Sequence, residues 1–185
     1  MDFFDSNVTV YHTAACEGGP LSRDLLLQAA QRYSGLECHQ LGSVETNPWG
    51  KPFFPQHPEL QFSVTHSGDW WMCAFSAQPV GLDLQLHRTH TAPERLSRRF
   101  FHPLEHGFLV RDGHRSFFDL WCAKESFVKY IGRGFYDAPE TFSVVSETGA
   151  FPDAQGVEFR LLPFAAEYSL CLCAQHLGEI RLRAL

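Results

Sequence analysis

Two carboxylates stand where the sequence pattern would not ordinarily place them. Residues 80–86 read VGLDLQL, a strict alternation that predicts a half-buried strand, and Asp83 lies inside it although aspartate is poorly suited to strands. Glu125 lies in a helix-like segment, where helical spacing puts it beside Trp121 and Lys129 at the border of an apolar stripe. A carboxylate at such a border must be paired or bound to a cation, because burying it alone is costly.

Each acid also has an ordinary explanation. Taken alone, Asp83 fits a solvated residue on the outer face of an edge strand, and Glu125 fits an i,i+4 ion pair with Lys129. Taken together, a strand carboxylate and a helix carboxylate with lysines close by favour a Mg²⁺ ion that also holds phosphate oxygens. Such an ion keeps several waters, so one or two protein carboxylates are enough.

Other polar residues leave two interpretations open. His66 ends a strand-like run before a Gly turn, and Lys51 lies in a constrained GKP sequence; each could contact a phosphate or simply satisfy a loop. Zinc-like histidine spacings occur at 87/90 and 102/106, without the Cys pair or HExxH glutamate of zinc sites, which favours surface histidines. A Gly-rich P-loop, a GxSxG elbow and a GxGxxG fingerprint are all missing from the sequence.

Composition narrows the class of protein. The chain has 185 residues, 44% of them hydrophobic and 19% charged, which is ordinary for a globular domain or two packed halves. A net charge of −6 argues against broad affinity for nucleic acid, so an anionic ligand must be met by a local basic cluster. The apolar runs are far too short to cross a membrane.

The cysteines indicate a reducing compartment. There are six of them, at positions 16, 38, 73, 122, 171 and 173, in a chain whose acidic start does not resemble a signal peptide. We expect all six to be reduced, mostly as small core residues, in a cytoplasmic protein.

The residue patterns predict helices at three places. Helical spacing and good helix formers indicate one over 21–33. Residues 91–113 predict two short helices, of which the second begins near Pro103 and ends at Gly113. The strongest pattern is 116–132, where Ser116 and Asp119 resemble a capping box.

Strands account for most of the remainder. After a Pro- and Gly-rich loop at 46–58, the runs 60–66, 70–76 and 80–86 predict a three-stranded antiparallel meander. Strands of a second sheet are predicted at 140–146, 157–163, 168–174 and 179–185. The order of helix then strands, occurring twice, predicts an α+β fold of two similar halves, residues 1–90 and 91–185.

Five sequence segments, taken in order, resemble those of a known protein family. The sequences GKPFFP, FSVTHSGDWWMCAFS, QPVGLDLQ, RRFFHPLE and LWCAKESFVKYIGRG resemble, in this order, the signature blocks of Sfp-type 4′-phosphopantetheinyl transferases, over roughly residues 47–145. Any one block would be a weak signal, whereas five with compatible gaps are a strong one.

The resemblance implies a specific activity. Members of this family transfer the phosphopantetheine arm of coenzyme A to a serine of an apo acyl or peptidyl carrier protein and release 3′,5′-adenosine bisphosphate. It implies Mg²⁺, or Mn²⁺ in its place, and a pseudo-dimer of two halves, each an antiparallel sheet with a packed helix, with the site between them. The expected partners are the carrier protein and coenzyme A, with a monomeric enzyme and no role for nucleic acid or membrane.

The resemblance also implies residue roles. Asp83 and Glu125 match the metal-binding carboxylates, and Glu125, directly or through a metal-bound water, is the expected general base for the serine. With Lys129 they form the expected catalytic set. The positions that match coenzyme A contacts are Lys51, Thr65, His66, Lys124 and Lys129.

Two departures from the family pattern stand out. The strand motif of the family is usually Asp-x-Glu, whereas here Gln85 follows Asp83, an amide that can still ligate the metal but lacks the charge. Basic residues usually precede the first helix, whereas here only Arg23 is nearby to hold the nucleotide. These departures motivate an alternative, a non-catalytic homologue that binds a carrier protein or coenzyme A with a weakened metal site.

The segment 88–99 concentrates positive charge. It carries four arginines in an otherwise acidic protein, Arg88, Arg95, Arg98 and Arg99. Either they form a docking surface for an acidic carrier protein, or they solvate a helix and pair with local acids.

Overall fold

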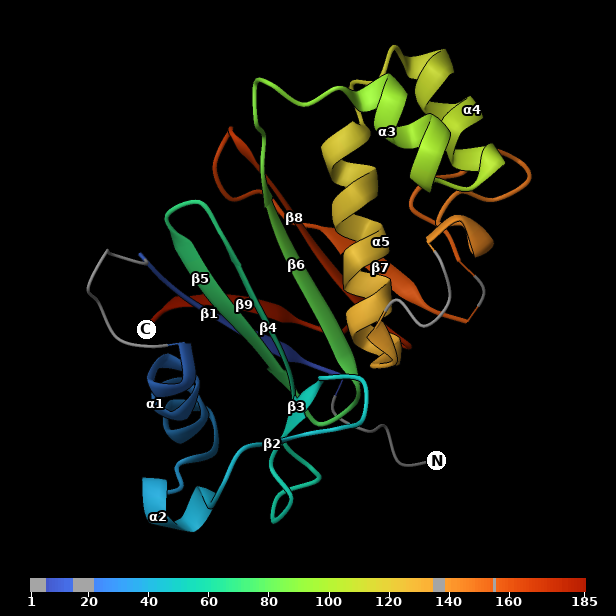
Figure 1. Ribbon diagram of the computed structural model, residues 1–185. Coiled ribbons are helices and arrows are strands. Elements are labelled where there is room, and N and C mark those ends of the chain that lie inside the picture. Colours follow the sequence, from blue (N-terminus) through green and yellow to red (C-terminus); the bar gives the residue numbers. More distant parts are fainter. Residues whose placement is uncertain (1–5, 15–21, 135–138, 155) are drawn as a thin grey trace.

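The computed structural model describes residues 6–14, 22–134, 139–154 and 156–185 and has a mixed α+β architecture (Figure 1). The strands are β1 (Val8–Ala14), β2 (Glu45–Thr46), β3 (Pro52–Phe53), β4 (Gln61–Ser67), β5 (Trp70–Ser76), β6 (Val80–Leu86), β7 (Glu158–Leu161), β8 (Tyr168–Ala174) and β9 (Ile180–Ala184). The helices are α1 (Ser22–Ser34), α2 (Cys38–Leu41), α3 (Pro93–Phe100), α4 (Pro103–Asp112), α5 (Phe117–Ile131) and the 3₁₀ turn η2 (Pro139–Thr141).

The strands form two main sheets. The first has the order β4-β5-β1-β9, antiparallel except for the parallel pair β1–β9, and the second is the antiparallel sheet β6-β8-β7. The α+β class is thus confirmed. The predicted halves, 1–90 and 91–185, stay a prediction. Each sheet contains strands from both halves, because β6 pairs with β8 and β9 pairs with β1.

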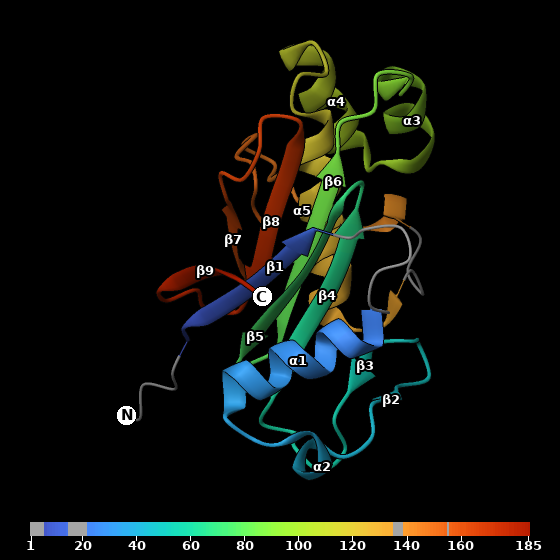
Figure 2. The same ribbon diagram turned by 90° about the vertical axis from the view of Figure 1, so that its left-hand side faces the viewer.

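The two sheets pack face to face between helices. Apolar residues of β1 and β5 meet those of β6 and β8 in one core cluster, to which Val10, Met72 and Leu82 belong. The opposite face of the first sheet is covered by α1, as Figure 2 shows, and that of the second sheet by α5. Because β5 and β8 are buried on both faces, their sequences are mostly apolar rather than strictly alternating between apolar and polar residues.

The predicted meander of 60–66, 70–76 and 80–86 is only partly correct. Strands β4 and β5 pair as expected, but β6 leaves that sheet and pairs with β8. Hydroxyl groups of β4 replace the missing ladder: Ser63, Thr65 and Ser67 accept hydrogen bonds from the backbone N–H groups of β6 residues 82, 84 and 86, at 3.0, 3.2 and 2.9 Å. Hydroxyl groups at every second residue of β4 therefore connect the edge of the first sheet to β6 of the second sheet by hydrogen bonds.

The C-terminal strands also differ from the prediction. Residues 140–146 form no strand, because Val144 and Val145 are buried near α5 and the Val144 N–H donates to the Glu105 carboxylate instead (2.8 Å). The final strand, β9, belongs to the first sheet rather than the second. Part of the predicted 46–58 loop forms the short β2–β3 pair.

The helices α1, α3, α4 and α5 lie where they were predicted, whereas the short helix α2 was not predicted. One helix cap also differs from the prediction. Ser116 makes no side-chain cap at α5, and Asp119 accepts a hydrogen bond from the Ser169 hydroxyl of β8 instead. A capping box is found at α4, formed by His102 and Glu105. Among the helices of the described residues, none is both long and apolar enough to cross a membrane.

Five cysteines can be placed, and each is a free thiol. Four are buried, Cys73, Cys122, Cys171 and Cys173, while Cys38 is exposed; Cys16 lies outside the described residues. The expectation of reduced core cysteines is confirmed for these four.

Candidate active site

Strand β6 carries Asp83 into a buried position between β4 and α5. The face of β6 that bears Gly81 and Asp83 lies against α5, so closely that a Cβ on Gly81 would lie 1.9 Å from the Ser126 carbonyl oxygen. Only glycine allows this approach, and a glycine inside a predicted strand was the signal for it in the sequence. The close packing brings strand and helix side chains into one cluster.

The Asp83 carboxylate is held through one oxygen. Its Oδ1 accepts hydrogen bonds from Lys129 Nζ (2.7 Å) and from Thr65 Oγ1 (3.2 Å). Its Oδ2 is buried and has no hydrogen-bond partner among the described residues. Burial raises the pKa of Asp83, while the Lys129 charge and the hydrogen bonds from Lys129, Thr65 and Cys122 oppose the rise.

Glu125 shares the same electrostatic environment. Burial, together with the negative charge of Asp83, raises its pKa to about 7, against the opposing charge of Lys129. The i,i+4 ion pair of Glu125 with Lys129 does not form, because the Lys129 ammonium pairs with Asp83 instead. The negative charge of Asp83 thus makes Glu125 harder to ionise, and the single lysine Lys129 opposes the rise in pKa at both carboxylates.

This arrangement fits a divalent cation. An unpartnered buried carboxylate oxygen is costly unless something positive faces it, and Glu125 offers a second carboxylate nearby. Within the described part of the chain, no three His, Cys, Asp or Glu side chains group as metal ligands. A two-carboxylate site that leaves positions for water and phosphate suits Mg²⁺.

Gln85 lies two residues along β6 from Asp83, and alternation puts it on the same strand face. It is half-buried, and its amide nitrogen donates to the Leu86 carbonyl at 3.2 Å. Its role as a metal ligand stays a prediction.

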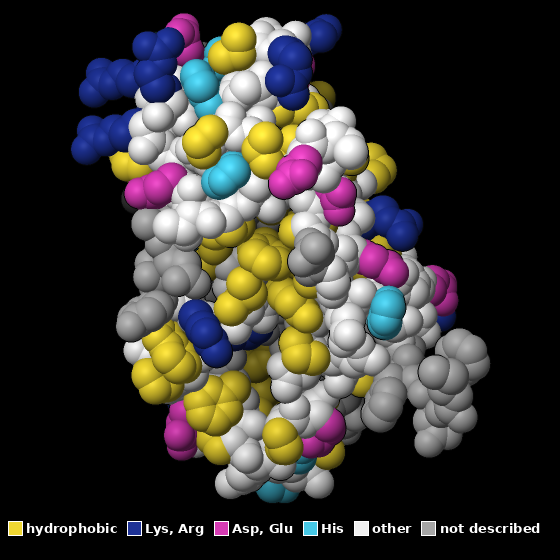
Figure 3. All heavy atoms as spheres, turned by 90° about the vertical axis from the view of Figure 1, so that its right-hand side faces the viewer, with side chains coloured by type: hydrophobic (Ala, Val, Ile, Leu, Met, Phe, Trp, Pro, Cys, Tyr) yellow, Lys and Arg dark blue, Asp and Glu magenta, His cyan; other side chains and the backbone are white. Residues whose placement is uncertain are grey.

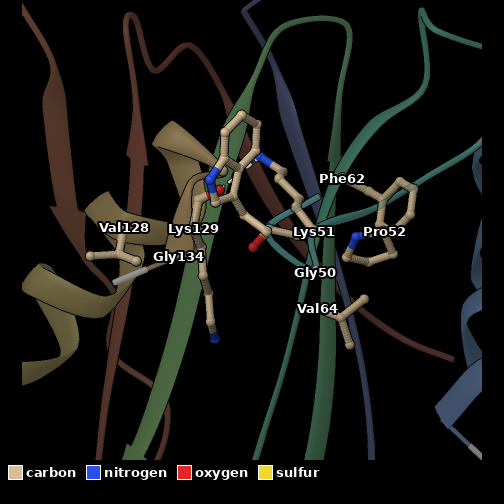
Figure 4. A pocket seen from close by; sticks show the side chains of 11 residues that line it. Gly50, Lys51, Pro52, Phe62, Val64, Val128, Lys129 and Gly134 are labelled. Carbon is tan, nitrogen blue, oxygen red and sulfur yellow. Dashed lines mark hydrogen bonds between the residues drawn. The ribbon is translucent and has the colours of Figure 1, made fainter. Parts of the chain in front are cut away.

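A pocket of about 240 Å³ opens beside this cluster (Figure 4). Its walls come from the turn before β3, from β4 and from the last turns of α5. The lining residues are Trp49, Gly50, Lys51, Pro52, Phe62, Ser63, Val64, Val128, Lys129, Gly132 and Gly134. Mostly apolar walls that include the Lys129 side chain suit a flat ring that carries phosphates.

Three of the expected coenzyme A contacts, Thr65, His66 and Arg23, are not among the residues that line this pocket. Thr65 is buried. Its hydroxyl donates a hydrogen bond to Asp83 and accepts one from the backbone N–H of Leu84 in β6. His66 is exposed on the other face of β4, and Arg23 is exposed on α1. Their contacts with coenzyme A stay predictions.

Lys124 makes its polar contacts inside the protein, and its expected coenzyme A contact stays a prediction. Its side chain is 4% exposed, and its ammonium pairs with the fully buried Glu105 at 2.8 Å and donates to the Phe142 carbonyl at 2.8 Å. The ammonium therefore holds α5 to α4 and to the chain after η2, and does not face the pocket. Sequence reasoning missed Glu105, whose only signal was its place after Pro103 in a capping pattern.

A second pocket, of about 190 Å³, lies on the α3 side of Glu125. It is almost entirely apolar and is lined by Phe100, Phe101, Trp121, Lys124, Glu125 and Pro139. In Figure 3, apolar side chains run down the middle of this side of the molecule, and basic side chains gather at its upper end. The four arginines of 88–99 are all exposed, and Arg98 pairs with Glu94 at 2.8 Å.

Several known proteins are similar to this chain in sequence. The profile of the 4′-phosphopantetheinyl transferase superfamily matches residues 79–181. A 4′-phosphopantetheinyl transferase of Bacillus subtilis is 31% identical over 90% of this chain and 77% of its own length. The Sfp transferase of the same species, strain 168, is 32% identical over 71% of this chain and 62% of its own length. The gsp transferase of Aneurinibacillus migulanus is 37% identical over 49% of this chain and 38% of its own length. The chain therefore belongs to the 4′-phosphopantetheinyl transferase superfamily, in its Sfp-type branch.

Proposed function

We propose that this protein transfers the 4′-phosphopantetheine group of coenzyme A to a serine of an apo carrier protein and requires Mg²⁺. The observation that carries the proposal is the cluster of Asp83, Glu125 and Lys129 beside a pocket of nucleotide character. Phosphoryl transfer depends mainly on positioning and on charge stabilisation, and this cluster provides both.

Asp83 and Glu125 would hold the Mg²⁺ ion, the first through its unpartnered Oδ2. An ion bound by these residues would supply positive charge to the phosphate oxygens of coenzyme A. Asp83 fixes the Lys129 ammonium, which is 29% exposed and can reach an incoming phosphate. Gln85 would add an amide oxygen on the same strand face.

The reaction forms a bond from the serine oxygen to the pantetheine-bearing phosphorus and breaks the bond from that phosphorus to the bridging oxygen. The leaving group is 3′,5′-adenosine bisphosphate. Glu125 is the proposed general base and takes the serine proton, directly or through a water.

The pocket beside Lys129 would receive the adenine nucleotide. Trp49 is half-exposed at its rim, and Val64 and Val128 offer apolar surface to the base. Thr65, His66 and Arg23 are the remaining residues proposed to contact the nucleotide and its phosphates.

The carrier protein would dock on the side that holds α3. The exposed arginines 88, 95, 98 and 99 offer positive charge, and the apolar pocket beside Glu125 accepts a side chain next to the serine. The buried free thiols suit a cytoplasmic enzyme, which we propose acts as a monomer.

A mass-shift assay tests the proposal. The protein is incubated with coenzyme A, Mg²⁺ and a panel of apo carrier proteins, and each carrier is weighed by mass spectrometry. We expect a phosphopantetheine mass on at least one carrier, lost with Asp83→Ala and with chelator. If every carrier stays unmodified while a known transferase modifies it, the proposal is wrong.

Gln85 favours one second candidate, a homologue that binds a carrier protein or coenzyme A without catalysis. Calorimetry separates the two. Tight carrier binding without Mg²⁺-dependent binding of coenzyme A would support the second candidate.

A further inference from the structure

The ammonium group of Lys51 is turned into the protein. Its Nζ lies 2.7 Å from the Lys129 carbonyl oxygen, 3.4 Å from that of Tyr130 and 3.5 Å from that of Val80. In Figure 4 the Lys51 and Lys129 side chains point in different directions. The ammonium of Lys51 thus binds the end of α5 and the start of β6, although its aliphatic stem lines the nucleotide pocket.

A second hydrogen bond connects the turn at residues 47–51, which contains Lys51, to the C-terminal end of α5. The Asn47 side chain donates to the Gly132 carbonyl at 2.8 Å, and its oxygen accepts the N–H groups of Trp49 and Lys51 at 3.0 and 2.9 Å. Gly132 has a positive φ of 71°, and a Cβ there would lie 2.7 Å from Lys51 Cδ. The 47–51 turn therefore fits closely against the helix end.

The electrostatics agree with this geometry. The last carbonyls of a helix lack partners within it and carry partial negative charge, so a cation there is stabilising. Burial lowers the pKa of Lys51 to about 8, and the nearby Cys173 thiol opposes this. A buried ammonium with carbonyls around it has little capacity left for a phosphate.

We propose that Lys51 is a positioning residue that clamps the 47–51 turn to the last turn of α5, rather than a ligand of a coenzyme A phosphate. The clamp sets the distance between the pocket wall and Lys129. Lys51 binds the backbone carbonyl of Lys129, while the Lys129 ammonium binds Asp83. The consequence for catalysis rests on the proposed function; the clamp itself does not.

The test compares Lys51→Met with wild type. Methionine keeps an apolar stem but removes the ammonium. Arg115→Met is the matched control, because Arg115 Nε likewise donates to a carbonyl at a helix end, that of Asp112 in α4 (2.7 Å). Hydrogen exchange of amides 128–132 is measured in the free proteins, and steady-state kinetics are measured with coenzyme A and with dephospho-coenzyme A.

For Lys51→Met we expect faster exchange in the last turn of α5. We also expect KM to rise by about tenfold for both donors, as for the loss of one charge-assisted hydrogen bond, with kcat within about twofold. The ratio of the two KM values stays at its wild-type value, and the control changes neither readout.

Two results would overturn the proposal: unchanged exchange at 128–132, or a KM ratio that moves to about one because Lys51 contacts the 3′-phosphate. If Lys51→Met fails to fold, Asn47→Ala removes the second fastening and must show the same faster exchange and equal rise in KM, otherwise the proposal is wrong. Should wild type transfer nothing, the proposed function fails, while the exchange data still decide the clamp.

Discussion

Lys129 Nζ lies 2.7 Å from Oδ1 of Asp83 and joins the last turns of α5 to the middle of β6. The bond occupies one carboxylate oxygen and leaves the other, Oδ2, buried without a partner among the described residues. A lysine that would ordinarily pair with Glu125 one turn away is thus committed to a strand, and Glu125 is left available for other chemistry.

Mg²⁺ binding is expected to depend on pH through Glu125. The raised pKa, about 7, means that this carboxyl is largely protonated at pH 6 in the metal-free protein, and a bound cation must displace the proton. Apparent affinity should rise about fivefold from pH 6 to pH 7 and level off above about pH 8. Calorimetry in buffers of different ionisation enthalpy measures both the affinity and the proton release.

Glu125→Gln should abolish this pH dependence, whereas Glu147→Gln, at an exposed turn, should preserve it. A wild-type affinity that is flat between pH 6 and pH 8 would place Glu125 away from the cation.

Replacing Gln85 by glutamate should tighten Mg²⁺ binding. The change adds a negative charge on the strand face of Asp83, and we expect about a tenfold gain in affinity, equivalent to about 1.4 kcal/mol. Gln28→Glu adds the same charge on the exposed side of α1 and should have little effect. Equal affinities for Gln85→Glu and wild type would show that residue 85 does not face the ion.

Alanine at two glycines should have opposite effects on stability. A Cβ at Gly81 would lie 1.9 Å from the Ser126 carbonyl oxygen and force β6 away from α5, at a cost of about 3 kcal/mol and with weaker Mg²⁺ binding. A Cβ at Gly107 meets only Arg111, at 3.6 Å, so alanine there should stabilise α4 by about 0.5–1 kcal/mol. Urea unfolding measures both, and a neutral Gly81→Ala would contradict the close packing.

Lys124→Met should destabilise the fold rather than weaken coenzyme A binding. It leaves Glu105 buried without its ion pair, which costs about 3–5 kcal/mol. Glu105→Gln in the same chain should recover part of the loss. The control is Arg98→Met, which breaks an exposed pair and should cost less than about 1 kcal/mol. A stable variant with a much higher KM for coenzyme A would instead support the phosphate contact.

Local patterns predicted most elements correctly. The helix over 116–132 and the strands around Asp83 have periodicities that depend only on neighbours in the sequence, and the structure confirms them. The prediction of a strand at 140–146 was wrong. Its residues are strand-like, but the Val144 N–H donates to the Glu105 carboxylate and not to a neighbouring strand.

The sequence by itself determined the family and the α+β class, and it singled out Asp83 and Glu125 as candidate site residues. Motif order and residue periodicity are properties of the chain alone. Only the tertiary structure decided which side chains meet. It paired Lys129 with Asp83 rather than Glu125, buried Lys124 against Glu105 and turned Lys51 into the end of α5. It also moved β6 into the second sheet and β9 into the first. These outcomes depend on which surfaces pack and which buried polar groups still need partners, and both are set by contacts between residues far apart in the sequence.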